Sequence, residues 1–275
     1  MSTGVDLDAL LRQLHLANAR RAWKALCARA EKEDWTYQHF LEVLVTEETA
    51  QRRATRVTRD VRRAGFPFLK TVDDFNFTFQ STLRMSMLGT YLSPDFITDG
   101  RNVVLYGKPG RGKTHLAIAV AYRAIQNGFT ARFITAAALI DELAAASRRG
   151  EMKDAIAAWV HPNVLVIDEM GYLAYGTDAA NLLFHVVNER HLKRRSMVFT
   201  TNKPLNSWGK VLHDPDLGET IVDRILERGS VLRLDGPSVR SRHVDPKDLD
   251  GPDPVGSEPA IVSGTDRPEF PEPAL

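Results

Sequence analysis

The stretch Gly107-Lys108-Pro109-Gly110-Arg111-Gly112-Lys113-Thr114 decides the fold class of this 275-residue chain. It matches the phosphate-binding loop pattern Gly-x4-Gly-Lys-Thr, in which glycines let backbone N–H groups turn toward phosphate oxygens. The apolar run 102–106 before it predicts a buried strand, and residues 114–126 after it predict a helix. This context disfavours a chance match in a glycine-rich turn. We expect nucleotide binding, with Lys113 on the β- and γ-phosphates and Thr114 on Mg²⁺.

The residue after the loop is His115. Its position places His115 among the nucleotide-binding residues. We expect its side chain to pack against neighbouring residues and not to take part in catalysis. The eight histidines form no metal-ligand pattern in the sequence. The Mg²⁺ that accompanies ATP is therefore the one metal we expect.

Apolar strands alternate with amphipathic helices after the loop. Strands are predicted at 102–106, 130–135, 163–168, 196–201 and 230–234, and helices at 113–126, 137–147, 151–159, 178–193 and 217–228. Strands separated by helices imply a parallel sheet with helices on both faces, an α/β fold.

Polar side chains follow two of these strands. Asp168 and Glu169 end the run Val-Leu-Val-Ile, and Asn202 follows the strand 196–201. Because parallel strands end on one side of a sheet, these residues should meet the loop there. We expect Asp168 to hold Mg²⁺, Glu169 to polarise the attacking water and Asn202 to position it. The alternatives are a strand-end turn for the two acids and a turn-forming Asn before Lys203-Pro204.

Residues 1–66 predict helices. Leucines recur at helical spacing from Leu7, a break follows at 31–34, and Thr36 is a candidate N-cap for the next helix. Gly65 ends the helical region. Residues 67–100 then read as a connector that contains a short helix at about 82–91.

A basic stripe lies near the end of this helical region. Four arginines recur at steps of four, three and four residues, on one face of a helix: Arg52, Arg56, Arg59 and Arg63. The opposite face is small and apolar: Ala50, Ala54, Val57, Val61 and Ala64. The stripe is a DNA-backbone surface in one interpretation and a solvated helix face in the other.

Composition excludes several classes of protein. Cys27 is the one cysteine, so no internal disulfide can form, and no apolar stretch approaches the ~20 residues of a membrane span. The acidic N-terminus is not a secretory signal, so we expect a cytoplasmic protein. Residues 245–275 carry eight acidic and two basic residues, which leaves a net charge of +7 on residues 1–244. We expect this Pro-rich tail to be disordered.

Taken together, these motifs resemble the AAA+ ATPases, and in detail the IstB-type transposition helper ATPases, close to the DnaC-type helicase loaders. The resemblance covers residues 6–244 and includes the connector motif 70–77 and the run 221–225. It implies a helical N-terminal domain at 1–66, a connector at 67–100, an AAA+ domain at 101–244 and the tail. It also implies that Asn202 is a sensor, that Arg224 is an arginine finger acting on a neighbouring subunit, and that Arg240 is a second sensor. A surface ion pair with Asp223 or Glu227 is the alternative for Arg224.

The resemblance implies an ATPase that assembles on duplex DNA with ATP and assists an insertion-sequence transposase. Its expected partners are DNA, the transposase and further copies of itself, with no membrane. A helicase loader that uses ATP as a switch is the alternative. A small-molecule kinase fits less well, because Glu169 beside Asp168 suits water activation and the chain has no arginine-rich lid segment.

Overall fold

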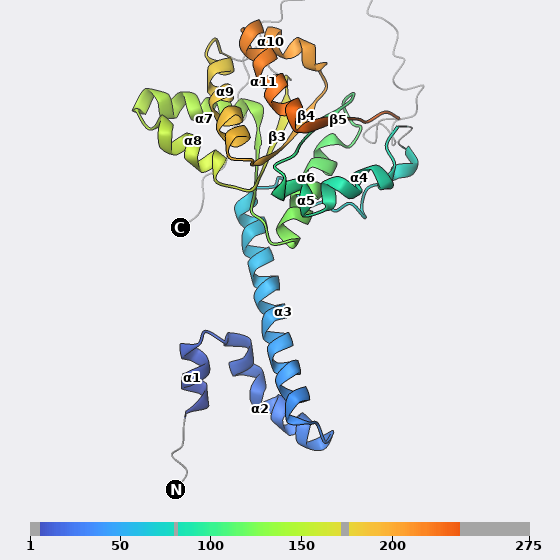
Figure 1. The fold of residues 1–275 in the computed structure, drawn as a ribbon, viewed down its shortest axis with the longest axis vertical. Coiled ribbons are helices and arrows are strands. Elements are labelled where there is room, and N and C mark those ends of the chain that lie inside the picture. The colour runs from blue at the N-terminus through green and yellow to red at the C-terminus, as the bar shows by residue number, and fades with distance from the viewer. Residues whose placement is uncertain (1–5, 80–81, 172–175, 237–275) are drawn as a thin grey trace, which may run out of the picture. The chain divides into compact units, whose positions relative to one another are not determined.

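The computed structural model, which describes residues 6–79, 82–171 and 176–236, contains the predicted parallel sheet. Its five strands lie in the order β2-β3-β4-β1-β5 (Figure 1). Every neighbouring pair is parallel. The strands are β1 Asn102–Tyr106, β2 Ala131–Thr135, β3 Val164–Met170, β4 Ser196–Thr201 and β5 Gly229–Arg233.

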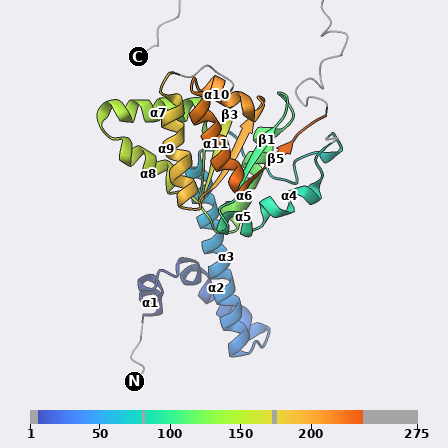
Figure 2. The same cartoon turned by 45° about the horizontal axis from the view of Figure 1, so that its top comes forward.

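Two hydrophobic cores cover the two faces of this sheet. Side chains alternate along each strand, so Val103 and Leu105 enter one core while Val104 enters the other. The first core contains residues of α6 (Lys113–Gln126), and the second contains residues of α7 (Ala136–Arg149) and α9 (Ala179–Leu192). Figure 2 shows α7 and α9 on the side of the sheet away from α6.

The predicted elements of this region are confirmed, with small shifts at their ends. The helix at 113–126 and the strands at 102–106 and 196–201 have the predicted bounds. The remaining helices are α8 Met152–Val160 and α11 Pro215–Glu227. Helix α11 starts two residues earlier than predicted because Asp214 caps it, with Pro215 at its first position. The short α10 (Trp208–Val211) was not predicted.

The N-terminal region is helical, as predicted, and consists of α1 (Leu7–Gln13), α2 (Ala17–Lys32) and α3 (Tyr37–Ala64). The Thr36 hydroxyl caps α3 by accepting from His39 N at 3.2 Å, and Gly65 ends it in the left-handed conformation. The break between α1 and α2 was not predicted. It falls at His15, a residue with a positive φ of 56°.

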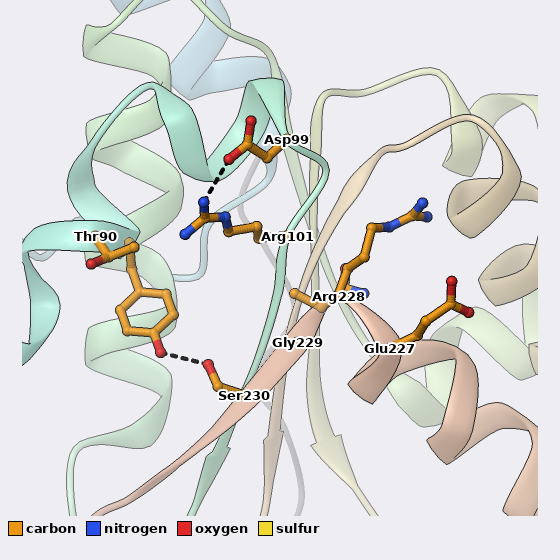
Figure 3. A pocket seen from close by; sticks show the side chains of 9 residues that line it. Thr90, Asp99, Arg101, Glu227, Arg228, Gly229 and Ser230 are labelled. Atoms are coloured by element: carbon orange, nitrogen blue, oxygen red, sulfur yellow. Dashed lines mark hydrogen bonds and ion pairs between the residues drawn. The ribbon is translucent and has the colours of Figure 1, made fainter.

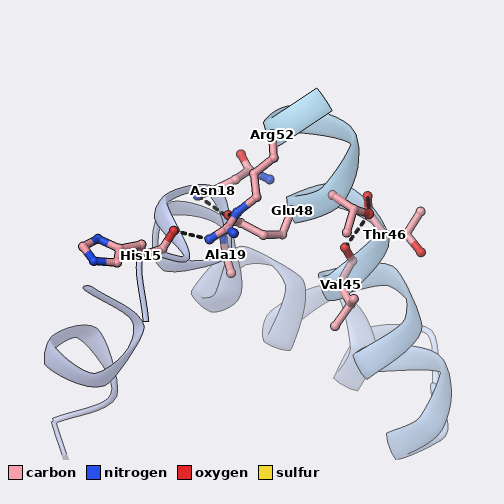
Figure 4. A network of polar contacts seen from close by, with 8 residues as sticks. His15, Asn18, Ala19, Val45, Thr46, Glu48 and Arg52 are labelled. Carbon is pink, nitrogen blue, oxygen red and sulfur yellow. Dashed lines mark hydrogen bonds and ion pairs between the residues drawn. The ribbon is translucent and has the colours of Figure 1, made fainter. Parts of the chain in front are cut away.

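A buried carboxylate from α3 caps the start of α2 (Figure 4). Glu48 is 4% exposed and accepts hydrogen bonds from Asn18 N at 2.9 Å and Ala19 N at 2.8 Å. Arg52 Nε donates to Glu48 at 2.7 Å, and the Arg52 guanidinium also contacts the His15 carbonyl. Since Leu16 offers no side-chain cap, Glu48 supplies the acceptor that α2 lacks locally.

Only the last part of α3 packs against the sheet region. Val57 and Val61 are half-buried against the first core, and Ala64 is fully buried. The predicted apolar face is wrong for Ala50 and Ala54, which are exposed like every other residue from 49 to 56. The connector carries α4 (Met85–Leu92), near the predicted helix, and a short α5 (Asp95–Thr98).

No helix among the described residues has the length and apolar character needed to cross a bilayer.

Candidate nucleotide site

The loop between β1 and α6 can cradle an anion because two of its positions exclude any side chain. A Cβ on Gly107 would lie 2.3 Å from the Leu234 carbonyl oxygen. Gly112 has a φ of +82°, and a Cβ there would lie 2.6 Å from the Phe75 ring. The Lys113 ammonium lies over the loop and donates to the carbonyls of Gly107 at 2.8 Å and Lys108 at 2.9 Å.

The two predicted magnesium ligands lie together. Thr114 Oγ1 lies 3.0 and 3.1 Å from the two carboxylate oxygens of Asp168, although 54 residues separate them. Asp168 is 4% exposed and also accepts from Thr200 Oγ1 at 2.5 Å. The first turn of α6 and the strand β4 therefore hold this carboxylate from two sides.

Glu169 differs from its neighbour in both environment and backbone. It is exposed and has a positive φ of 59°, at a register shift of β3 between Ile167 and Met170. Its N–H donates to Thr200 Oγ1 at 2.9 Å. A positive φ is costly for a residue other than glycine, and it turns Glu169 out of the buried pattern of the strand.

Asn202 follows β4, the strand between β3 and β1. The preceding carbonyl, that of Thr201, accepts from Gly107 N at 3.2 Å, which places the end of β4 against the start of the loop. The Asn202 Oδ1 is buried and has no hydrogen-bond partner among the described residues. A buried amide oxygen without a partner is costly, as is expected of an atom held ready for a ligand.

The connector covers the start of α6. Phe75 packs on Gly112 and lies edge-on to His115, with 5.2 Å between ring centroids. His115 Nε2 lies 2.8 Å from the Thr71 carbonyl oxygen. The Asp74 carboxylate accepts from Thr71 N and Oγ1, and these hydrogen bonds lower its pKa. The sequence analysis gave Phe75 no role in the site, although Phe75 belongs to the connector motif 70–77 that contributes to the resemblance.

Arg224, the predicted arginine finger, makes no contact with the loop among the described interactions. Arg224 Nη1 lies 3.8 Å from Glu227 Oε2 on α11, which is the ion pair weighed as its alternative role. His191 also contacts Glu227, at 3.3 Å. Arg240 lies outside the described residues.

The basic stripe of α3 is exposed, but its members differ. Arg52 is tied to Glu48, and Arg59 Nε contacts Asp60 at 3.1 Å. Arg56 lies against Gly128, and neither it nor Arg63 has an acidic partner among the described residues. Two of the four stripe arginines, Arg52 and Arg59, therefore have acidic partners and are not free to meet phosphates. Arg53, which was not predicted, donates to the Gln126 carbonyl at 3.1 Å.

The donors present suit ATP with Mg²⁺. The loop offers a lysine and two glycine positions where no side chain fits, and Asn202 offers a buried oxygen without a hydrogen-bond partner among the described residues. Thr114 and Asp168 supply hard oxygen ligands of the type that Mg²⁺ binds alongside phosphate oxygens and water. No group of three or more His, Cys, Asp or Glu side chains in the described part of the chain forms a separate metal site.

This sheet order and loop geometry define an AAA+-like phosphate-loop protein. Within that class, the chain belongs to the family of IstB-like ATP binding proteins, whose model matches residues 9–246. It therefore shares with that family an ATP-binding site and an association with insertion sequences.

Two relatives span most of the chain. It is 33% identical over 84% of its length, and 91% of the relative's, to the "Insertion sequence IS5376 putative ATP-binding protein" of Geobacillus stearothermophilus. It is 30% identical over 86% of its length, and 88% of the relative's, to the "Insertion sequence IS21 putative ATP-binding protein" of Pseudomonas aeruginosa.

Solved structures share the fold. The crystal structure of the DnaI protein aligns with 60% of this chain and 91% of its own, with a TM-score of 0.51 and 16% identity. The replication initiator DnaA bound to AMPPCP and single-stranded DNA aligns with 61% of this chain and 50% of its own, with a TM-score of 0.50 and 16% identity.

Proposed function

We propose that this protein is an ATP-hydrolysing, DNA-binding helper of an insertion-sequence transposase. Family membership supports the link to insertion sequences, since both relatives are named as ATP-binding proteins of such elements. The observation that carries the ATPase proposal is the contact between Thr114 and Asp168 beneath the loop, beside an exposed Glu169.

Each residue of the site has a separate task in this proposal. The loop amides and Lys113 bind the phosphates. Thr114 and Asp168 hold Mg²⁺, which when bound neutralises charge on the phosphate oxygens. Glu169 accepts a proton from the attacking water, and Asn202 holds that water or the γ-phosphate in line. The Thr200 hydroxyl donates to the Asp168 carboxylate and accepts from the backbone N–H of Glu169. The same side chain therefore positions both the metal ligand and the base.

Arg224 completes this site from a neighbouring subunit in our proposal. In a single chain its guanidinium contacts Glu227 at 3.8 Å and is 39% exposed, so it can be released at little cost. An arginine placed on the transferred phosphoryl group stabilises the charge that builds there. Hydrolysis would then depend on assembly into an oligomer.

DNA binding would rest on the excess positive charge of residues 1–244 and on the exposed arginines of α3. Arg56 and Arg63 are the members of the stripe best able to meet phosphates, because they have no acidic partner among the described residues. Phosphate contacts give affinity without sequence information.

The experiment that tests this function is a mass measurement of the full chain with ATP and Mg²⁺, with and without duplex DNA. We expect a small species without ATP and a larger assembly with ATP and duplex DNA. A mass that ATP and duplex leave unchanged would contradict the proposal. Stable capture of a replicative helicase, with no effect of duplex DNA, would favour the helicase loader.

A further inference from the structure

Basic side chains gather at the amino edge of the sheet, opposite the edge that carries the nucleotide site. They come from α3 beside the turn that precedes β2, and from the turns that precede β4, β1 and β5. We call them the amino-edge band, and its members are Arg53, Arg56, Lys193, Arg194, Arg195, Arg101 and Arg228.

Direct packing of three turns holds one end of the band together. A Cβ on Gly100 would lie 2.7 Å from the Arg194 backbone, so the turn before β1 touches the turn before β4. The Asn102 N–H donates to the Arg228 carbonyl at 2.9 Å, and the Arg228 guanidinium contacts the His191 carbonyl. Arg101, Arg194 and Arg228 are therefore brought together by the backbone and not by chance side-chain conformations.

The surface is hollowed at both ends of the band. A cavity of about 440 Å³ is lined by residues that include Arg101 and Arg228 together with the acidic Asp99 and Glu227 (Figure 3). In Figure 3 the Arg101 guanidinium turns toward Asp99, while that of Arg228 points away from Arg101. At the other end, a cavity of about 470 Å³ is lined by residues that include Arg53, Arg56 and Gln126.

Acidic neighbours neutralise only part of this charge. Arg101 pairs with Asp99 at 2.7 Å, and Lys193 pairs with Glu189 at 3.0 Å. Arg194 and Arg195 have no acidic partner in the described part of the chain. Arg194, which is exposed, and Arg195, which is half-buried, thus remain without an acidic partner in the middle of the band.

The backbone at Arg194 also indicates that its charge is retained for a reason. It follows the C-cap of α9 and has a φ of 50°, at a position where helices usually place glycine or asparagine. An arginine there costs about 1 kcal/mol relative to glycine. Keeping it is explained if the guanidinium binds something.

We propose that the amino-edge band binds the phosphate backbone of duplex DNA. The proposal rests on the DNA-binding function above and extends it from α3 onto the ATPase core. Five strands at ~4.8 Å spacing span about 19 Å, which corresponds to about six phosphate steps of one strand of a duplex, at ~3.4 Å of helix axis each. The edge is separated from the nucleotide by the length of the strands, about 16 Å. Loss of the band should therefore leave ATP binding intact.

The test uses R194Q/R195Q in the full chain with ATP and Mg²⁺, titrated with two unrelated duplexes over a salt series. R20Q/R21Q is the matched control, since Arg20 and Arg21 are adjacent, exposed and without acidic partners among the described residues. R194K/R195K keeps the charge.

We expect R194Q/R195Q to weaken binding about tenfold on both duplexes and to lower the salt slope by about 1.8, while ATP affinity stays at the wild-type value. R20Q/R21Q and R194K/R195K should bind like the wild type.

An unchanged slope in R194Q/R195Q would overturn the proposal, and so would an equal loss in R20Q/R21Q, which would show an effect of net charge alone. If the wild type bound neither duplex, the DNA-binding function itself would fall, and this surface with it. If the wild type and R194Q/R195Q bound DNA equally well, the amino-edge band would be excluded as a DNA-binding surface, while the DNA-binding function would stand.

Discussion

At the scale of single residues, Asp168 and Glu169 show how adjacent carboxylates receive different roles. Asp168 is buried and bonded to two hydroxyls, whereas Glu169 is exposed and held at a positive φ. The first arrangement suits a metal ligand with a fixed position, and the second suits a base that must reach water.

This difference predicts the effect of E169Q. The amide keeps the size of the side chain but cannot accept a proton, so ATP should still bind while turnover falls at least 100-fold. Binding of a fluorescent ATP analogue and release of phosphate are the two measurements, with E31Q, an exposed substitution on α2, as the control. ATP turnover by E169Q near the wild-type rate would remove Glu169 from the site.

The role of Arg190 was not predicted from the sequence and is revealed only by the structure. Its buried guanidinium donates to five backbone carbonyls, those of Trp159, Val160, Pro162, Asn163 and Ser196. These lie at the end of α8, in the turn before β3 and at the start of β4. Burial, with a smaller contribution from Arg195, lowers the pKa of Arg190 to about 9, so the group remains charged at pH 7.

We expect R190M to lose about 3 kcal/mol of unfolding free energy or more, because it leaves the carbonyls without donors. The unfolding free energy of R190K should lie between those of the wild type and R190M, since a single ammonium cannot replace the planar guanidinium fork. Urea unfolding of the three proteins, with R194Q as the exposed neighbour, measures this. An R190M protein within 0.5 kcal/mol of the wild type would show that the carbonyls find other partners at about no cost.

At the scale of elements, α3 contacts two different parts of the protein, which its sequence pattern did not distinguish. Its first half holds α2 through Glu48, and its last two turns pack on the sheet region through Val57, Val61 and Ala64. The eight residues between them, 49–56, are all exposed. The arginine stripe therefore includes one member, Arg52, that serves the fold.

The Glu48 cap predicts a pH-dependent contribution to stability. Burial raises the pKa of Glu48, but hydrogen bonds from Ala19 N, the Arg52 side chain and Asn18 N outweigh it and lower the pKa below its usual value of 4.5. A carboxylate with a lowered pKa stabilises the fold above its unfolded pKa, and this contribution is lost as the pH falls through the folded pKa.

We expect E48A to cost about 2 kcal/mol at pH 7, with the same difference down to about pH 5 and a smaller one below pH 4.5. E47Q, on the exposed side of the same turn, should behave like the wild type. R52Q should also destabilise, whereas R56Q should not. Thermal unfolding across pH 7 to 4 tests this, and a difference that grew toward acid pH would contradict the cap.

The sequence predicted those elements whose signal is local. The helix at 113–126 and the strands beside it have dense apolar patterns, which predict them directly. The phosphate-loop motif and the acidic end of the strand 163–168 together predicted that Thr114 and Asp168 lie close to each other. The capping role of Glu48 could not be predicted from local sequence. Its partner Ala19 is 29 residues away, and without that contact Glu48 resembles any exposed glutamate on a helix. The break at His15 depends on the same packing. Arg190 needs carbonyls from several turns that only the finished sheet assembles.

At the scale of the whole molecule, the proposed role of Arg224 requires that two subunits share each ATP site. K113A should lose ATP binding, because the loop loses its cation, and R224A should bind ATP but turn it over about 10³-fold more slowly. Mixing the two inactive proteins should restore part of the activity, since some interfaces pair an intact loop with an intact Arg224. Phosphate release across a range of mixing ratios measures this, and no recovery at any ratio would exclude a shared site.

In the proposed function, ATP controls the affinity of this protein for duplex DNA. The most direct test is the affinity of the full chain for one duplex, measured with ATP and Mg²⁺, with ADP and without nucleotide. We expect the wild type and E169Q to bind at least tenfold more tightly with ATP, about 1.4 kcal/mol of coupling, and K113A to bind alike under all three conditions. Equal affinity of the wild type for DNA with and without ATP would contradict the account.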